Sequence, residues 1–204
     1  MSRRCRFVRR VLEVNGLPDS GDRKAYRRRT RTHMITEPKI EHRNEQPYMG
    51  IRAQVTMQEL GKVLPPLWGE VFAWLASKGL KPTGAPLWRY RVIDMAAKLE
   101  IDVAVPVAGA AIGDNRIMAD ILPAGRYATL IYTGPYKGLM QATADLLAWG
   151  EKKSIVWDKR PAGPKSEAWR ARIENYLTDP TKEPDPAKWE TELAFKLADD
   201  QRAS

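Results

Sequence analysis

The chain has 204 residues, with 34 basic and 25 acidic side chains and a net charge of +9. This length allows one compact core or two small halves that share an interface, and it excludes two large independent domains. Its single cysteine, Cys5, excludes an intrachain disulfide, and no apolar run approaches the roughly 18 residues of a membrane span, so we expect a cytoplasmic protein without membrane contact.

Most of the positive charge lies in residues 1–33, where eleven Arg and Lys residues face three acidic ones. Because this segment has few apolar residues, we expect a disordered basic extension, and Met34 is then a candidate start of the natural protein. Such an arm binds nucleic acid weakly at most, through phosphates, and a solvated tail is the simpler interpretation. Residues 34–204 carry a net charge of only +1, which argues against a nucleic-acid-binding domain.

From Met34 onward, β-like runs alternate with helical stretches in an order that occurs twice. The first half contains, in chain order, a hairpin of 39–42 and 48–55, a helix that follows the capping-box pair Thr56 and Glu59 and ends near Gly79, and strands at 87–93 and 99–105. Pro65 and Pro66 indicate that the first turn of this helix is separate or kinked, because proline lacks the N–H donor.

The second half repeats this order. It contains a hairpin of 117–122 and 127–132, a helix opened by Gly134-Pro135-Tyr136 with a buried stripe at Leu139, Ala142, Leu146 and Leu147, and strands at 172–177 and 191–197. The stretch 159–167, which is rich in proline and glycine, should form an exposed and mobile loop able to cover a groove.

The predicted fold is therefore α+β, with two βαββ-type units, each an antiparallel sheet with one main helix, and a ligand groove between the units. We expect acidic and aromatic side chains on the face that the helices leave open: Glu100, Asp102, Glu174, Tyr176 and Glu192, with Trp88 and Tyr90 at positions that match Glu174 and Tyr176. A carboxylate in such a cleft needs a partner or a cationic ligand, and Arg89 and Arg91 on a neighbouring strand are candidate partners.

Metal and cofactor chemistry have little support in the sequence. His33 and His42 are the only histidines, so no metal site built from His and Cys is expected. No phosphate-cradling loop or dinucleotide fingerprint occurs, so no cofactor is expected. Four tryptophans occur at no regular spacing, and packing explains them best: Trp149, Trp157, Trp169 and Trp189.

Five segments share their order and spacing with one known family: Tyr48-Met-Gly-Ile-Arg-Ala-Gln-Val55, Pro123-Ala-Gly-Arg-Tyr-Ala-Thr129, Tyr132-Thr-Gly-Pro-Tyr136, Tyr176-Leu-Thr-Asp-Pro180 and Trp189-Glu-Thr-Glu-Leu193. From about Glu37 to Asp199 the chain resembles the GyrI-like (gyrase-inhibitor-like) small-molecule-binding domain, which is related to the effector-binding domains of multidrug-responsive transcription activators. The resemblance implies two pseudo-twofold-related, SHS2-like units with a ligand pocket in the groove between them.

The resemblance also implies which residues contact the ligand. In the related drug-sensing domains, glutamates on the last two strands meet cationic aromatic ligands among tyrosines, and the matching residues here are Glu174 and Glu192. The candidate ligand site is completed by Tyr176, Trp88, Tyr90 and Glu100. The sequence departs from many relatives at Ala194, where they carry a tyrosine.

The leading hypothesis is a stand-alone binding protein that sequesters or senses a small hydrophobic ligand, cationic or aromatic. Because some family members resemble hydrolases of cyclopropane-bearing natural products, a hydrolase that uses Glu192, Glu174 and Tyr176 is an alternative. A protein partner, as in the modulation of gyrase, is a third possibility.

Overall fold

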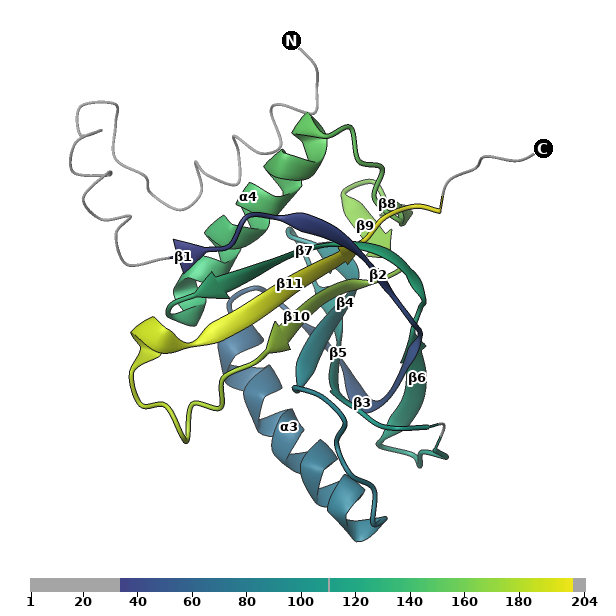
Figure 1. The fold of residues 1–204 in the computed structure, drawn as a ribbon. Helices are drawn as coiled ribbons and strands as arrows, with labels where there is room; N and C mark the ends of the chain where they lie inside the picture. Colours follow the sequence, from purple (N-terminus) through teal and green to yellow (C-terminus); the bar gives the residue numbers. More distant parts are fainter. Residues whose placement is uncertain (1–33, 110, 200–204) are drawn as a thin grey trace. The chain divides into compact units, whose positions relative to one another are not determined.

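The structure is a computed structural model in which residues 34–109 and 111–199 are described. The disordered arm predicted for residues 1–33 lies outside them. Eleven strands of the described residues form one antiparallel sheet, and two α-helices lie against one face of it (Figure 1). An α+β fold with an antiparallel sheet and few helices is thereby confirmed.

The helices are α3 (Leu60–Ser77) and α4 (Leu139–Lys152), with the short 3-10 helices η2 (Tyr136–Gly138) and η3 (Pro186–Lys188). No helix in the described part of the chain is long and apolar enough to cross a membrane. The strands are β1 (Met34–Ile35), β2 (Lys39–Arg43), β3 (Gln46–Val55), β4 (Leu87–Asp94), β5 (Leu99–Pro106), β6 (Met118–Leu122), β7 (Gly125–Thr133), β8 (Lys159–Gly163), β9 (Ser166–Trp169), β10 (Arg172–Tyr176) and β11 (Glu190–Lys196).

Strands β10 and β4 lie at the centre of the sheet, whose order is β1-β7-β11-β10-β4-β5-β3-β6. Strands β7, β11 and β10 come from the second predicted unit, and β4, β5 and β3 come from the first. The two units therefore lie side by side and meet where β10 pairs with β4. Their pseudo-twofold symmetry stays a prediction.

Both predicted hairpins are wrong. Strand β2 pairs with β7 rather than with β3, and β6 pairs with β3 rather than with β7. Each of these chain segments crosses from one unit to the other, and the sheet curls around the exchanged strands (Figure 1). Turn-forming residues at 44–47 indicate a change of direction, but the neighbour of a strand depends on which apolar faces can be buried together.

The stretch 159–167 is not the mobile loop expected from its prolines and glycine. Strand β8 pairs with β9, and β9 extends the sheet by pairing with β4, with Val92 opposite Ala168. At the end of β9, Trp169 is buried against Trp157 and Phe195. Burial of this ring anchors the hairpin, so the stretch is not a loop, although β8 is exposed as expected.

Helix α3 carries the end signals that the sequence contains. The Glu59 carboxylate accepts hydrogen bonds from the backbone N–H and the hydroxyl of Thr56, at 2.8 and 2.9 Å. Gly79 follows the last turn with a φ of +66°, a conformation that glycine adopts without strain. Both signals are local, and for that reason the sequence predicted the ends of the helix well.

The two prolines of α3 lie inside a single continuous helix, so the predicted separation of its first turn is wrong. Pro65 and Pro66 remove two backbone donors, which weakens the helix at this point. Leu60 and Leu64 are buried against the sheet, and their packing holds the first turn in line. Tertiary packing thus outweighs the local cost of the prolines.

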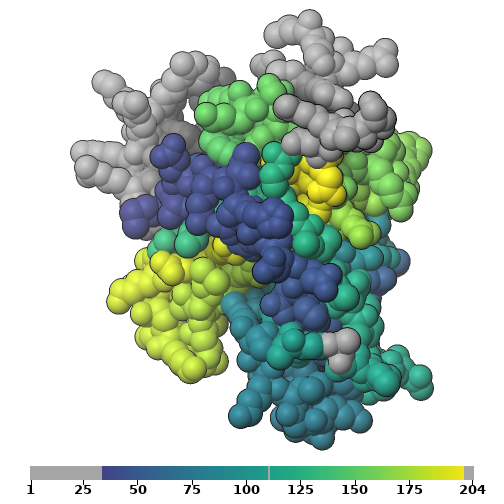
Figure 2. All heavy atoms as spheres, turned by 45° about the vertical axis from the view of Figure 1, so that its right-hand side comes forward, coloured from purple at the N-terminus to yellow at the C-terminus, as the bar shows by residue number. Residues whose placement is uncertain are grey.

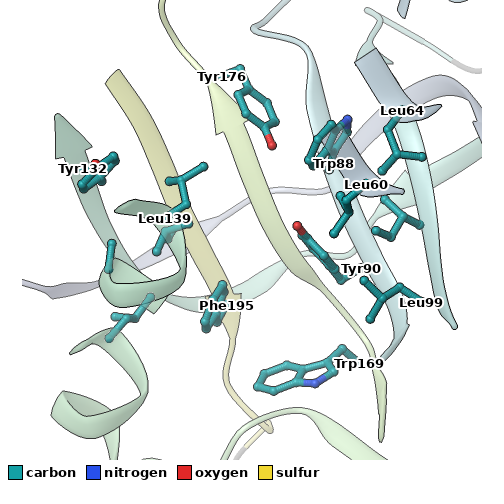
Figure 3. Close-up of a cluster of buried hydrophobic side chains, with 14 of the residues drawn as sticks. Leu60, Leu64, Trp88, Tyr90, Leu99, Tyr132, Leu139, Trp169, Tyr176 and Phe195 are labelled. Atoms are coloured by element: carbon teal, nitrogen blue, oxygen red, sulfur yellow. The ribbon is translucent and has the colours of Figure 1, made fainter. Parts of the chain in front are cut away.

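Both faces of the sheet are packed. On the face that we call the helix face, α3 and α4 cover a cluster that includes Leu60, Leu139 and Phe195 (Figure 3). On the opposite face, a second cluster includes Tyr48 and Ile173. Because the strands are buried on both sides, the alternation of their residues does not reveal which side the helices cover.

Gly50 in β3 has no room for a side chain, because a Cβ there would lie 2.7 Å from the carbonyl oxygen of Val103 in β5. Gly50→Ala should lower the free energy of unfolding by about 1–3 kcal/mol. Gly69 in α3 meets open space, so Gly69→Ala should raise it by up to about 1 kcal/mol. Urea unfolding followed by circular dichroism measures both, and equal midpoints would contradict the packing of β3 against β5.

Candidate functional site

Glu174 and Glu192 point to opposite faces of the sheet. In the pairing of β10 with β11, Glu174 lies opposite Leu193 and Asn175 lies opposite Glu192. Paired residues share a face, so Glu174 joins Leu193 on the helix face and Glu192 projects from the other side. The expected grouping of both glutamates in one groove is wrong, because Ile173, the apolar neighbour of Glu174, packs into the opposite-face core.

Four of the predicted site residues do come together, on the helix face: Trp88, Tyr90, Glu174 and Tyr176. Trp88 lies directly opposite Glu174 in the pairing of β4 with β10. The hydroxyls of Tyr90 and Tyr176 point into the space between their rings, with Trp88 beside them (Figure 3). Ala194 belongs to the opposite-face core, so the tyrosine that relatives carry there is not missing from this group.

Five aromatic rings form a continuous row on the helix face, which we call the aromatic row: Trp88, Trp68, Tyr176, Tyr136 and Trp189. Trp68 of α3 stacks on Trp88, with ring centroids 5.5 Å apart, and meets Tyr176 edge-on at 4.8 Å. Tyr136 of η2 contacts Tyr176 at 5.4 Å and Trp189 at 4.6 Å. The row thus joins α3 to the segment that begins α4.

The outer end of the aromatic row reaches the connection between β10 and β11. Trp189 lies in this connection, directly before β11, and its indole N–H donates to the carbonyl of Glu183 at 2.8 Å. In the space-filling view the connection stands out as a yellow-green lobe, with a notch between it and the blue-teal surface beside it (Figure 2). The row therefore extends from the buried sheet toward the molecular surface.

Glu174 is a buried carboxyl group that the protein supplies with hydroxyl donors. Its exposed fraction is 7%, and its Oε2 accepts a hydrogen bond from the Tyr176 hydroxyl at 2.7 Å. Burial raises the pKa of Glu174, and the interactions with Tyr176, Arg172 and Tyr90 oppose that shift without cancelling it. Burial likewise raises the pKa of both tyrosines, so they act as neutral donors.

Arg172 lies two residues before Glu174 on β10 and therefore on the same face. Its guanidinium sits over three rings, 5.6 Å from the centroid of Tyr90, 5.3 Å from Trp169 and 4.9 Å from Phe195. Burial lowers the pKa of Arg172, while the neighbouring Tyr90 and Glu174 raise it. Cation–π contacts of this kind stabilise a guanidinium without satisfying its N–H donors.

Several donors around the aromatic row have no acceptor among the described residues. The indole nitrogens of Trp68 and Trp88 are enclosed without a hydrogen-bond partner, and so is Nε of Arg172. The principal acceptor nearby, Glu174, already receives the Tyr176 hydroxyl. Buried polar groups without a partner are uncommon in native proteins, so this group of donors needs an explanation.

Glu192 lies on the wall of a pocket of about 380 Å³ on the opposite face. Its carboxylate accepts hydrogen bonds from Arg43 at 2.6 Å and from the amide of Asn175 at 2.7 Å. An arginine therefore neutralises Glu192, but it is Arg43 rather than Arg89 or Arg91. A carboxylate that is already paired does not need a cationic ligand.

The other predicted residues of the opposite face belong to a separate cluster of charges. Arg89 and Arg91 lie 3.4 and 2.9 Å from Asp120, and Glu100 lies 3.8 Å from Arg52. These arginines are thus not partners of Glu174 or Glu192, which corrects the expectation from sequence. Glu100 also lies on the face away from the aromatic row, so the structure does not bring it to the helix-face group.

Three residues of this group were not predicted from the sequence, Trp68, Tyr136 and Arg172, and Trp189 was assigned to packing. A signal existed for Trp68, which lies four residues after Leu64 and therefore on the same side of α3. A signal also existed for Arg172, which shares the strand parity of Glu174. No local signal places Tyr136, because its contact with Tyr176 joins segments 40 residues apart.

Among the described residues, no group of three or more His, Cys, Asp or Glu side chains is placed to hold a metal ion.

The model of a known family, the GyrI-like small molecule binding domain, matches residues 36–198. The chain belongs to this family. No curated protein matches the sequence.

Solved structures share the fold at low sequence identity. The C-terminal domain of EcmrR is 21% identical over 80% of this chain and 98% of that domain, with a TM-score of 0.62. SAV2435 bound to tetraphenylphosphonium is 12% identical over 80% of this chain and 94% of its own, with a TM-score of 0.53. A hydrolase from Listeria innocua is 13% identical over 79% and 92%, with a TM-score of 0.54.

The raised pKa of Glu174 predicts a pH-dependent stability. The folded protein favours the protonated carboxyl more than the unfolded chain does, so this contribution is full below the ordinary pKa of 4.5 and is lost as the pH rises through the folded value. The melting temperature of Glu174→Gln should therefore rise relative to that of the wild type as the pH increases from about 4 to 7. Thermal melts across this range test it, with the exposed Glu190→Gln as the control for the loss of one charge. Parallel wild-type and Glu174→Gln curves would contradict it.

Proposed function

We propose that the protein binds a small aromatic ligand on the helix face, between α3 and α4, where the aromatic row holds it by stacking beside Glu174. The observation that carries this proposal is the continuous row of five rings around one buried carboxyl group. Membership of a family of small-molecule-binding domains supports it. Binding would serve to sequester or to sense the ligand.

The construction of the row suits an incoming ring. Trp88 and Tyr176 are fixed on central strands, whereas Trp68 lies on a helix and Tyr136 and Trp189 lie in short connecting elements. A ligand ring would stack on Trp88 and Tyr176 in the place of a ring from one of these other elements. Aromatic contacts of this kind contribute roughly 0.5–1.5 kcal/mol each beyond the area they bury.

The neighbours by fold agree with a ligand of this size. SAV2435 is bound to tetraphenylphosphonium, a compound of four aromatic rings. A cationic or aromatic ligand was also the expectation here, on the basis of Glu174 and Glu192. In this chain the carboxyl group has tyrosine donors and Arg172 close by, so the ring rather than the charge is the feature that the helix face selects.

Replacing Trp88 removes a fixed ring of the row. We expect aromatic compounds to raise the melting temperature of the wild type and to quench its tryptophan fluorescence, with a Kd about tenfold weaker in Trp88→Leu. Glu192→Gln is the matched control, because it alters the pocket on the opposite face and leaves the aromatic row intact. Weaker binding in Glu192→Gln with unchanged binding in Trp88→Leu would place the ligand on the wrong face for this proposal.

A hydrolase is a second candidate, and the raised pKa of Glu174 favours it. A buried carboxyl group with no arginine within ion-pair distance can stay protonated and act as a general acid. Glu174 would give its proton to the oxygen of an activated cyclopropane-bearing ketone as the strained C–C bond breaks. Water would add to the ring carbon and return a proton to Glu174, which balances the reaction.

This reaction predicts turnover of such a cyclopropane by the wild type and a rate at least about a hundredfold lower in Glu174→Gln, which cannot donate a proton. Tyr176→Phe keeps the ring but removes the hydroxyl donor, so it should lower the rate less. Chromatography of the ring-opened product measures both. Equal amounts of product with wild type and Glu174→Gln would mean that Glu174 does not catalyse the reaction, and binding would remain the proposed function.

A further inference from the structure

The hydrogen-bonding groups of the helix face are unbalanced. Enclosed donors without a partner among the described residues include Nε of Arg172 and the indole nitrogens of Trp68 and Trp88. Glu174, the acceptor beside them, is served by the Tyr176 hydroxyl and interacts with Tyr90 as well. These enclosed donors therefore have no acceptor among the described residues, and acceptor oxygens of a ligand would satisfy them.

Arg172 is the strongest of these donors. A guanidinium carries five N–H groups and stays charged in proteins, yet the enclosed Nε of Arg172 has no hydrogen-bond partner among the described residues. Three aromatic rings hold its plane in place, so its orientation is fixed before any ligand arrives. A fixed guanidinium with free donors is suited to a planar oxyanion, which it can bind with two parallel hydrogen bonds.

The position of Arg172 also affects a ligand of the opposite charge. Residues two apart on a strand are separated by about 7 Å, so a ring beside Glu174 brings its substituents within reach of Arg172. A cationic substituent would meet this positive charge in a largely enclosed site, where repulsion is weakly screened. The negative charge of Glu174 is thus offset by a neighbour on its own strand.

We propose that the ligand is an aromatic carboxylate, and that Arg172 binds its oxyanion while the aromatic row holds its ring. This inference rests on the proposed function and names the ligand class that the same site selects. Purely cationic aromatic compounds are disfavoured because Arg172 is adjacent to Glu174. The pairing of oxyanion with guanidinium supplies the acceptor that the helix face lacks.

Three probes of one shape and different charge test the ligand class: 2-naphthoate, 2-naphthamide and 2-naphthamidine. Isothermal titration calorimetry with the full chain should give the tightest Kd for the carboxylate, an intermediate Kd for the neutral amide and the weakest for the amidinium. The span from carboxylate to amidinium should reach about tenfold or more, as expected for a charge-assisted hydrogen bond. This comparison needs no variant, so a folding defect cannot obscure it.

Two substitutions then assign the preference to Arg172. Arg172→Gln should raise the Kd of 2-naphthoate about tenfold or more and make the Kd values of the three probes similar. Arg172→Lys keeps the charge but loses the planar fork, so its Kd for 2-naphthoate should rise less. Arg170→Gln is the matched control, because it removes the same charge from an exposed residue two positions earlier. That variant should keep the wild-type order of the probes.

The outcomes separate this inference from the function on which it rests. Equal affinities for the three probes that all weaken in Trp88→Leu would overturn the carboxylate preference and leave aromatic binding in place. An amidinium that binds tightest, or an Arg172→Gln variant that keeps the preference for carboxylate, would also overturn it. If no probe binds the wild type, both the preference and the proposed aromatic site fail.

Discussion

Glu174 is a carboxyl group buried between a sheet and two helices, and the groups that satisfy it organise the site around it. An isolated charge in such a place would cost several kcal/mol. The Tyr176 hydroxyl donates to it, Tyr90 lies against it, and Arg172 offsets its charge from two residues away. These partners fix the rings of the site, because Tyr176 also contacts Trp68 and Trp88 with its ring, and the ring of Tyr90 lies under Arg172.

The two faces of the sheet differ in how their charges are balanced. On the opposite face, arginine and carboxylate meet directly, as in Arg43 with Glu192 at 2.6 Å and Arg52 with Asp102 at 2.7 Å. Such pairs are complete without a ligand. On the helix face, Arg172 and Glu174 share a strand without forming an ion pair. Arg172 instead contacts aromatic rings, and Glu174 accepts a hydrogen bond from a tyrosine hydroxyl. The helix face thus places enclosed donors without a partner, the Trp68 and Trp88 indoles and Nε of Arg172, around rings rather than in ion pairs.

The sequence predicted the elements well because their signals are local: alternation in the strands, a capping contact and a terminal glycine in α3, and an apolar stripe in α4. The exchanged pairing of β2 and β6 could not be predicted, since it depends on burial between distant segments. For the site, Trp88 and Glu174 were predicted to line one groove, and they do lie together in the structure. The face of the sheet on which they lie was predicted wrongly. Ile173 and Glu174 are both buried, so the alternation of β10 does not show which side faces solvent.

The location of a bound aromatic ring tests the account most directly. A crystal structure of the protein with 2-naphthoate should show the ring of the ligand in contact with Trp88 and Tyr176 on the helix face. The carboxylate of the ligand should lie within hydrogen-bond distance of Arg172. Density for the ligand in the opposite-face pocket beside Glu192, with the aromatic row unchanged, would contradict the account.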